Sequence, residues 1–156
     1  MRVWRICSEP HASSALTGVG GLYTAGRWHH KGHPIVYTSA TPSLAALEVL
    51  VHVDPALAPG NMRLLEIDVP VEVGVELCDP EQIVSEWRVY PAPSELQEFG
   101  SRWLASLRSA VLRVPAAVMP VESNFLLNPR HPQFNSVRVI QDLPYAFDSR
   151  LLGRNK

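Results

Sequence analysis

Proline and glycine interrupt the apolar runs of this sequence at short intervals. The chain has 14 proline and nine glycine residues among 156, and both residue types break regular secondary structure. Short elements joined by many turns are therefore expected. Runs of β-branched and aromatic residues predict strands at residues 3–6, 35–39, 65–71, 110–114 and 136–140.

The third of these runs shows how a predicted strand is placed. Its apolar residues alternate with polar ones from Leu65 to Val71, which is typical of a strand with one wet face. Pro70 indicates the end of that strand or an edge of the sheet. The segment from Met119 to Phe134 is rich in proline, asparagine and histidine and is predicted to form turns.

Two segments have the periodicity of helices. Thr41 before Pro42 is typical of a helix start, because a threonine oxygen caps free N–H groups and proline is tolerated at the first helical position. This helix is expected to run from Pro42 to about Val53 and to end at Asp54-Pro55. Its predicted apolar arc holds Leu44, Leu47, Leu50 and Val51, with Glu48 about 40° beyond Leu44 at the edge.

The second helix is predicted between Ser94 and Leu107, although Gly100 lowers its intrinsic propensity. The sequence has no repeat, low-complexity tract or linker. It therefore predicts one α+β domain over residues 1–156, with a mixed or antiparallel sheet core and flanking helices. The tail from about residue 150, Gly153–Lys156 above all, is expected to fray.

Charge and cysteine content limit the classes of partner. The formal net charge is −1 and the pI is about 6.6, so direct binding to nucleic acid or to a membrane surface is not expected. Cys7 and Cys78 have neither framework spacing nor a CxxC pattern, so no disulfide scaffold or structural zinc site is predicted. The N-terminus has no secretory signal, and a cytoplasmic protein is expected.

The segment from Tyr23 to Pro34 interleaves cations with aromatic rings and resembles a binding loop. Arg27 can bind a planar or diphosphate anion through its fork of donors, and a ring such as that of Trp28 can stack on a base or a pyridine. The alternative is that Trp28 packs in the core and Arg27 pairs with a surface carboxylate. The histidines of this loop lack the partners of a familiar metal site, and no metal is predicted.

Two further positions are candidates for chemistry. Glu48 lies among apolar residues of the first helix and must reach solvent or meet a partner. The alternative is a rim glutamate paired with His52, one turn on, or with an arginine. Ser123 and Asn124 precede an apolar triplet, where they form a site or only cap a turn. A serine nucleophile at Ser123 is disfavoured because no GxSxG elbow surrounds it.

Several motifs in order give the chain a resemblance to the RES-domain family, the toxins of bacterial RES–Xre toxin–antitoxin pairs. The family takes its name from an arginine, a glutamate and a serine, which correspond here to Arg27, Glu48 and Ser123. The resemblance covers most of the chain. The matching segments are Trp4-Arg5-Ile6, Gly26-Arg27-Trp28, Val36-Tyr37, Leu47 to His52, Val114-Pro115 and Asn124 to Pro132.

This resemblance implies a fold like that of ADP-ribosyltransferases and an NAD+ site. Arg27, Tyr37 and Glu48 would form the catalytic set, and Ser123, Asn124 and Trp28 would help to bind substrate. The chain departs from the family where Ala25-Gly26 replaces a frequent glycine pair and where His29 replaces a frequent asparagine. Because the better-known transferases place their glutamate far along the chain, Glu122 is an alternative for the carboxylate role.

The implied reaction needs only one carboxylate, because nicotinamide leaves NAD+ as a neutral molecule from a bond that is already cationic. An ionised Glu48 would stabilise the oxocarbenium-like ribose. Arg27 would hold the diphosphate, and Tyr37 would stack near the nicotinamide or the ribose. The expected activity is NAD+ hydrolysis, or phosphorolysis with inorganic phosphate as co-substrate, without a resident cofactor. The alternatives are ADP-ribosyl transfer to a protein and a non-catalytic binding module.

The resemblance also implies a partner. An enzyme that drains NAD+ harms its own cell, so an Xre-like helix-turn-helix antitoxin is expected to cover the site. The toxin would then reach DNA only through that antitoxin. A homodimer or a larger toxin–antitoxin assembly is compatible with these residues.

Overall fold

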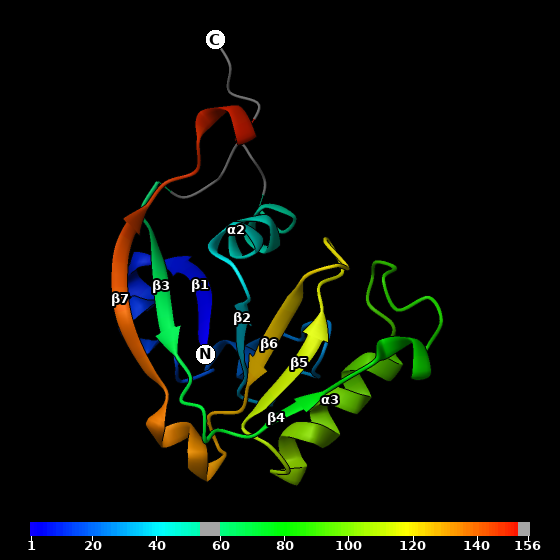
Figure 1. Ribbon diagram of the computed structural model, residues 1–156. Helices are drawn as coiled ribbons and strands as arrows, with labels where there is room; N and C mark the ends of the chain where they lie inside the picture. The colour runs from blue at the N-terminus through cyan, green and yellow to red at the C-terminus, as the bar shows by residue number, and fades with distance from the viewer. Residues whose placement is uncertain (54–59, 153–156) are drawn as a thin grey trace.

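A seven-stranded mixed sheet forms the centre of the computed structural model, which describes residues 1–53 and 60–152 (Figure 1). The strand order is β4-β5-β6-β2-β1-β3-β7. The strands are β1 (Arg2–Ser8), β2 (Val36–Ser39), β3 (Met62–Asp68), β4 (Val75–Leu77), β5 (Val111–Pro115), β6 (Ser123–Leu127) and β7 (Arg138–Tyr145). The helices are α1 (Gly20–Tyr23), α2 (Pro42–Leu50) and α3 (Ser94–Ser106), with 3₁₀ turns η1 (Glu9–Ser14), η3 (Pro80–Gln82), η4 (Pro132–Ser136) and η5 (Ser149–Leu152). The predicted α+β class is confirmed.

The register of the sheet decides which side chains share a face. Neighbouring strands are antiparallel except β4 and β5, which are parallel. Tyr37 lies opposite Leu126, and Ser39 lies opposite both Asn124 and Trp4. Because successive side chains alternate between faces, these five residues project to the same side. We call this side the helix face, because α2 and α3 pack on it.

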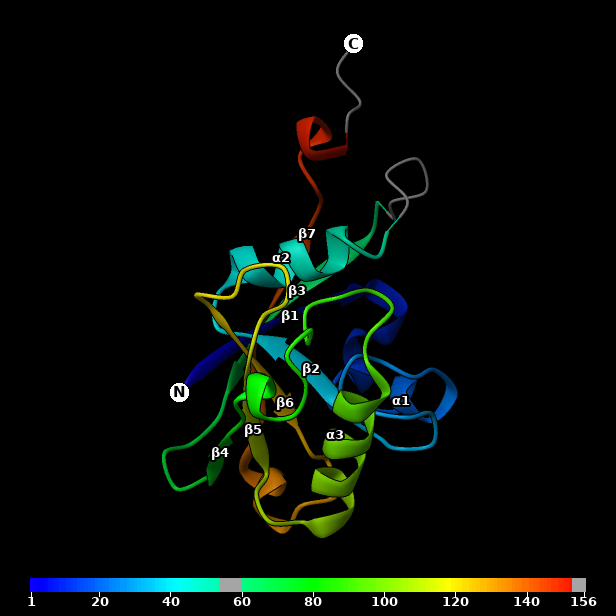
Figure 2. The same ribbon diagram turned by 90° about the vertical axis from the view of Figure 1, so that its right-hand side faces the viewer.

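Two hydrophobic clusters attach the helices to the helix face. Ala45 of α2 packs with Ile6 and Met62, from β1 and β3. Trp103 of α3 packs in a second cluster with Leu112 of β5 and other residues of that face. The opposite face is covered by a third cluster, to which residues of η1 and η4 contribute. Figure 2 shows α2 and α3 as separate bodies that meet the sheet at different places.

Helix α2 begins where the sequence predicts and ends earlier. The Thr41 hydroxyl accepts a hydrogen bond from the N–H of Leu44 at 3.1 Å, which is the predicted N-cap. The helix ends at Leu50 rather than near Val53. Val51 is 56% exposed, so a further turn would bury too little surface to offset the low helix propensity of the valines. The predicted stop at Asp54-Pro55 lies outside the described residues.

The buried side of α2 also differs from the predicted arc. Leu44 and Ala45 are the buried residues of the helix, whereas Val51 is exposed. At about 100° per residue, Glu48 falls between Leu44 and Ala45 around the helix axis. The carboxylate therefore projects from the middle of the side that packs on the sheet, and not from its edge.

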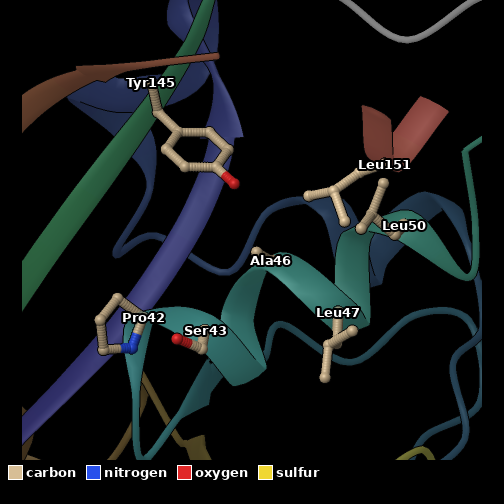
Figure 3. A pocket seen from close by; sticks show the side chains of 7 residues that line it. All are labelled: Pro42, Ser43, Ala46, Leu47, Leu50, Tyr145 and Leu151. Carbon is tan, nitrogen blue, oxygen red and sulfur yellow. The ribbon is translucent and has the colours of Figure 1, made fainter. Parts of the chain in front are cut away.

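Leu47 and Leu50, which were expected in the core, line a groove on the other side of α2. The groove has a volume of about 410 Å³, and Tyr145 and Leu151 form its opposite wall (Figure 3). The remaining lining residues are Pro42, Ser43 and Ala46. Helix α2 thus presents Glu48 on one side and leucines on the other.

The prediction that residues 119–134 form only turns is wrong, because β6 lies within this segment. Its five residues pair with β5 on one side, and four of them pair with β2 on the other. The polar residues Ser123 and Asn124 at its start are not typical of a buried strand. Leu126 and Leu127 are buried because the sheet surrounds them. Pairing on both sides therefore overrides the polar start of β6.

Other boundaries moved by a few residues. β3 ends at Asp68, and Val71 is 97% exposed beyond Pro70. The strand expected at residues 136–140 is β7, which starts later and runs through Pro144 to Tyr145. An edge strand tolerates this proline, because one side of its backbone needs no partner. β1 is longer than residues 3–6, and β4 was not predicted.

The tail is ordered further than expected, since Ser149–Leu152 forms η5. The predicted fraying of residues 153–156 lies outside the described residues. None of the helices in the described ranges combines the length and the apolar character that crossing a membrane requires.

Gly100 gives a test of how α3 is seated. A Cβ at this position would lie 1.9 Å from the carbonyl oxygen of Trp28, so helix and loop must separate in Gly100→Ala. We expect this variant to lose about 1–3 kcal/mol of unfolding free energy, although helix propensity alone would stabilise it by about 1 kcal/mol. Urea denaturation measures the change.

Gly20→Ala is the matched control, because a Cβ at Gly20 meets no atom within 4 Å. This variant is expected to be neutral or slightly stabilised. A Gly100→Ala variant as stable as Gly20→Ala would contradict the close packing of α3 on Trp28.

Candidate active site

Glu48 is held by a chain of hydrogen bonds that crosses three elements. The Ser39 hydroxyl of β2 donates to Oδ1 of Asn124 in β6 at 2.8 Å. Nδ2 of Asn124 then donates to Oε1 of Glu48 in α2 at 2.6 Å. The Ser39 bond fixes the orientation of the Asn124 amide, so that its N–H group faces the carboxylate. The sheet thereby fixes the direction of one carboxylate oxygen, and among the described residues Glu48 bonds to Asn124 rather than to His52, the alternative partner.

Arg27 is fastened to the segment before α3 and still presents one edge. Its Nη1 donates to the carbonyl of Trp87 at 2.5 Å, and Nη1 and Nη2 both donate to the carbonyl of Val89 at 3.2 Å. These bonds use the end of the guanidinium. Nε–H and the other Nη2 hydrogen donate to no atom of the described residues. These two donors form the side-on fork that binds a carboxylate or phosphate.

The Tyr37 hydroxyl is bonded inside the protein. It accepts from the backbone N–H of Trp28 at 3.2 Å and lies 2.8 Å from Nδ1 of His29. Burial raises the pKa of this hydroxyl, while the Trp28 bond and Arg27 act in the opposite direction and Glu48 adds to the rise. Tyr37 is therefore neutral, and its hydroxyl is occupied by the loop.

Arg27 and Glu48 lie close enough for their charges to interact. Burial lowers the pKa of the Arg27 guanidinium, whereas Glu48 and Tyr37 oppose that change. The structure thus groups the three predicted catalytic residues, Arg27, Tyr37 and Glu48, on the helix face of the sheet. A carboxyl group, a guanidinium and a neutral aromatic ring lie in one neighbourhood, which suits a ligand that carries both negative and positive charge.

Arg5 of the Trp4-Arg5-Ile6 motif bonds to the backbone of the strand that carries Tyr37. Its Nη1 donates to the backbone carbonyl of Tyr37 at 2.8 Å, and burial lowers the pKa of its guanidinium. Nε of Arg5 has no partner among the described residues. Arg5 was part of a recognised motif but was not predicted to act on Tyr37, because strand neighbours cannot be identified from the sequence alone.

Two predicted binding residues lie elsewhere. Trp28 is 3% exposed and packs edge-on against Phe99, with ring centroids 6.5 Å apart. Its indole belongs to the core, so the packing alternative corrects the predicted stacking role. Ser123 precedes Asn124 in β6 and therefore projects to the opposite face, where its hydroxyl accepts a hydrogen bond from Nε of Arg113 at 2.9 Å. Asn124, not Ser123, contacts Glu48.

The alternative carboxylate, Glu122, serves the start of α2. Its Oε2 accepts a hydrogen bond from the Thr41 hydroxyl at 2.9 Å, and the same hydroxyl caps the helix. A negative charge beside a helix N-terminus is favourable. Glu122 is thereby accounted for as a structural group.

Comparison with known proteins identifies the family. The model of the RES domain matches residues 2–148. The chain belongs to the RES-domain family. Among curated RES relatives, "Toxin Res" of Pseudomonas putida is 41% identical over 153 residues, which are 97% of this chain and 99% of the relative. "Toxin Res" of Yersinia enterocolitica is 38% identical over 97% of this chain and 99% of its own length.

A third relative has a more specific name. The "Prs ADP-ribosylating toxin" of a Sphingobium species is 36% identical over 97% of this chain and 96% of its own length. Among solved structures, the MbcT-MbcA toxin-antitoxin complex of M. tuberculosis contains a chain with the same fold. Its TM-score is 0.70 at 16% identity, over 97% of this chain and 86% of that one. The expected RES membership is confirmed.

The side chains of Asn124 and Ser123 point to opposite faces of the sheet, so their replacement is expected to affect stability differently. Asn124→Ala removes a part-buried hydrogen bond to a carboxylate and is expected to cost about 1.5–3 kcal/mol of unfolding free energy. Ser123→Ala removes an exposed contact and is expected to change stability by less than about 0.5 kcal/mol. Thermal and urea unfolding of the two variants gives the comparison, and equal losses would contradict the Asn124–Glu48 bond.

Proposed function

We propose that this RES protein cleaves the nicotinamide–ribose bond of NAD+ at the site built by Glu48, Arg27 and Tyr37. The observation that carries the proposal is the carboxylate of Glu48, oriented by Asn124 on the same face as a cation with a side-on fork. The names of the Res relatives support a toxin role. Two of the three residues that give the family its name, Arg27 and Glu48, lie in this cluster, whereas Ser123 lies on the opposite face of the sheet.

The chemistry follows from the charges. As the glycosidic bond breaks, its electron pair leaves with nicotinamide, which becomes neutral, and positive charge develops on the ribose. The ionised oxygen of Glu48 stabilises that charge. Water or inorganic phosphate then attacks the anomeric carbon. Water gives ADP-ribose and releases one proton, whereas phosphate gives a phosphorylated ADP-ribose.

Arg27 and Tyr37 bind two adjoining parts of the substrate. The side-on fork of Arg27 binds the diphosphate while its other donors stay on the carbonyls of Trp87 and Val89. Because the hydroxyl of Tyr37 is occupied, its ring supplies the contact with the nicotinamide ribose. Asn124 orients Glu48 and is not required to touch the substrate.

A second candidate function uses the same site. The name of the Sphingobium relative, an ADP-ribosylating toxin, favours transfer of ADP-ribose to a protein nucleophile in place of water. Labelled NAD+ distinguishes the two, because a macromolecule retains the label only after transfer.

We also propose an antitoxin as the partner of this chain, of the Xre-like helix-turn-helix type. The solved structure with a similar fold is a toxin–antitoxin complex, which supports the existence of such a partner. The antitoxin covers the site around Glu48 and so protects the cell from NAD+ loss.

The main test is the replacement of one carboxylate at a time. Glu48→Gln keeps the shape and the Asn124 contact but removes the charge, and we expect NAD+ turnover to fall by about 10²- to 10³-fold. Glu122→Gln keeps an acceptor for Thr41 and should retain activity. The measurement is NAD+ loss with product masses, with and without phosphate, using protein freed of antitoxin.

The products decide between the acceptors. ADP-ribose alone indicates hydrolysis, and a product heavier by a phosphate indicates phosphorolysis. Full activity in folded Glu48→Gln, or equal losses in the two variants, would contradict the assignment of Glu48.

Arg27→Lys tests the fork. A lysine keeps the charge but cannot bind a phosphate side-on while it also bonds two carbonyls. We expect the KM for NAD+ to rise by roughly 10- to 100-fold, as for the loss of a charged hydrogen bond, with a smaller change in kcat. Steady-state kinetics measures both constants, and an unchanged KM would remove Arg27 from substrate binding.

A further inference from the structure

His29 is a buried histidine that the proposed reaction does not use. It is 3% exposed and lies in the loop between α1 and β2. Its Nε2 is 3.0 Å from the backbone carbonyl of Thr24, and its Nδ1 is 2.8 Å from the Tyr37 hydroxyl. Both ring nitrogens are therefore engaged.

The chemistry of the partners fixes the tautomer. A carbonyl oxygen only accepts, so Nε2 carries the proton and donates to Thr24. Burial lowers the pKa of His29; the Thr24 bond opposes this shift, while His33 and His30 reinforce it. The ring is accordingly neutral at physiological pH, and Nδ1 has a lone pair for the Tyr37 hydroxyl.

The Tyr37 hydroxyl then has one donor role and one acceptor role, and both are filled. It donates to Nδ1 of His29 and accepts from the N–H of Trp28. These two bonds set the direction of the C–O bond and prevent the ring from moving along the sheet. The two rings also contact each other, with centroids 5.6 Å apart and planes inclined by 52°.

The backbone closes tightly around this pair. A Cβ on Gly26 would lie 2.6 Å from the Tyr37 hydroxyl oxygen and 2.9 Å from Cε1 of His29. Gly26 precedes Arg27, so the turn that delivers the arginine is the same turn that encloses the Tyr37–His29 contact. An isolated antiparallel bridge between Gly26 and His29 holds the two ends of this turn together.

We propose that His29 is the positioning residue for Tyr37. Its Nδ1 accepts a hydrogen bond from the Tyr37 hydroxyl and so holds the ring in the orientation that NAD+ cleavage requires. The inference rests on the proposed function, because it assigns to His29 a part in that reaction. His29 acts through Tyr37 and does not itself touch the substrate.

Two substitutions separate the bonds of His29. Asparagine places an amide oxygen near the position of Nδ1 and can accept from Tyr37, so His29→Asn is expected to retain most of the turnover. Glutamine places its amide near the position of Nε2 and keeps the Thr24 contact, but it leaves Tyr37 without its acceptor. We expect kcat of His29→Gln to fall by about tenfold, the scale of one lost hydrogen bond, with little change in KM.

The controls separate positioning from folding. In a Tyr37→Phe background, His29→Gln should cause no further loss of kcat, because the hydroxyl is already absent. His33→Gln, a change at a neighbouring loop histidine, should leave kcat unaffected. Thermal unfolding of each variant identifies any that are merely unfolded.

NMR of the imidazole nitrogens tests the contact without relying on activity. The wild-type protein should show His29 as the Nε2–H tautomer, with an Nδ1 signal that shifts in Tyr37→Phe. An Nδ1–H tautomer would overturn the inference, as would a His29→Gln variant as active as the wild type. Absence of NAD+ turnover by the wild type would instead overturn the proposed function, and the role of His29 in it.

Discussion

The pairing of β2 with β6 is the contact on which the site depends. β2 has four residues, and its polar side chains would not form a site without a neighbouring strand. Once β6 lies beside it, Ser39 meets Asn124, and Asn124 reaches Glu48 on the helix above. The backbone ladder thus determines where the carboxylate points, and a slip of one residue would turn Asn124 to the other face.

The sequence predicted those elements whose formation depends on residues adjacent in the chain. Thr41 and Pro42 identify the start of α2 because capping depends on adjacent residues. The central strand at residues 35–39 is a continuous β-branched and aromatic run, so it was found nearly to the residue. β6 was missed because it begins with two polar residues and depends on pairing with β2, which is far away in the chain, as well as with the preceding strand β5. β4 was missed because three residues carry almost no pattern.

The same division applies to the site. Arg27, Tyr37 and Glu48 followed from the motifs of the family, and the structure brings them to one face of the sheet. The directions of individual side chains did not follow, because they depend on register: Ser123 and Asn124 are adjacent but point to opposite faces. The rotation of α2 about its axis likewise depends on which of its residues contact the sheet. Leu47 and Leu50 are apolar and were predicted to be in the core, but they line the groove instead.

The order of the strands also has a consequence for the growing chain during synthesis. Glu48 is separated from Asn124 by 76 positions, and β6 is inserted between β5 and β2. A ribosome therefore makes the arginine loop, the tyrosine and the glutamate long before it makes the residue that aims the carboxylate. Any chain released before residue 124 lacks that hydrogen bond, whatever else it has folded. Premature termination over most of the message thus yields fragments without the oriented carboxylate.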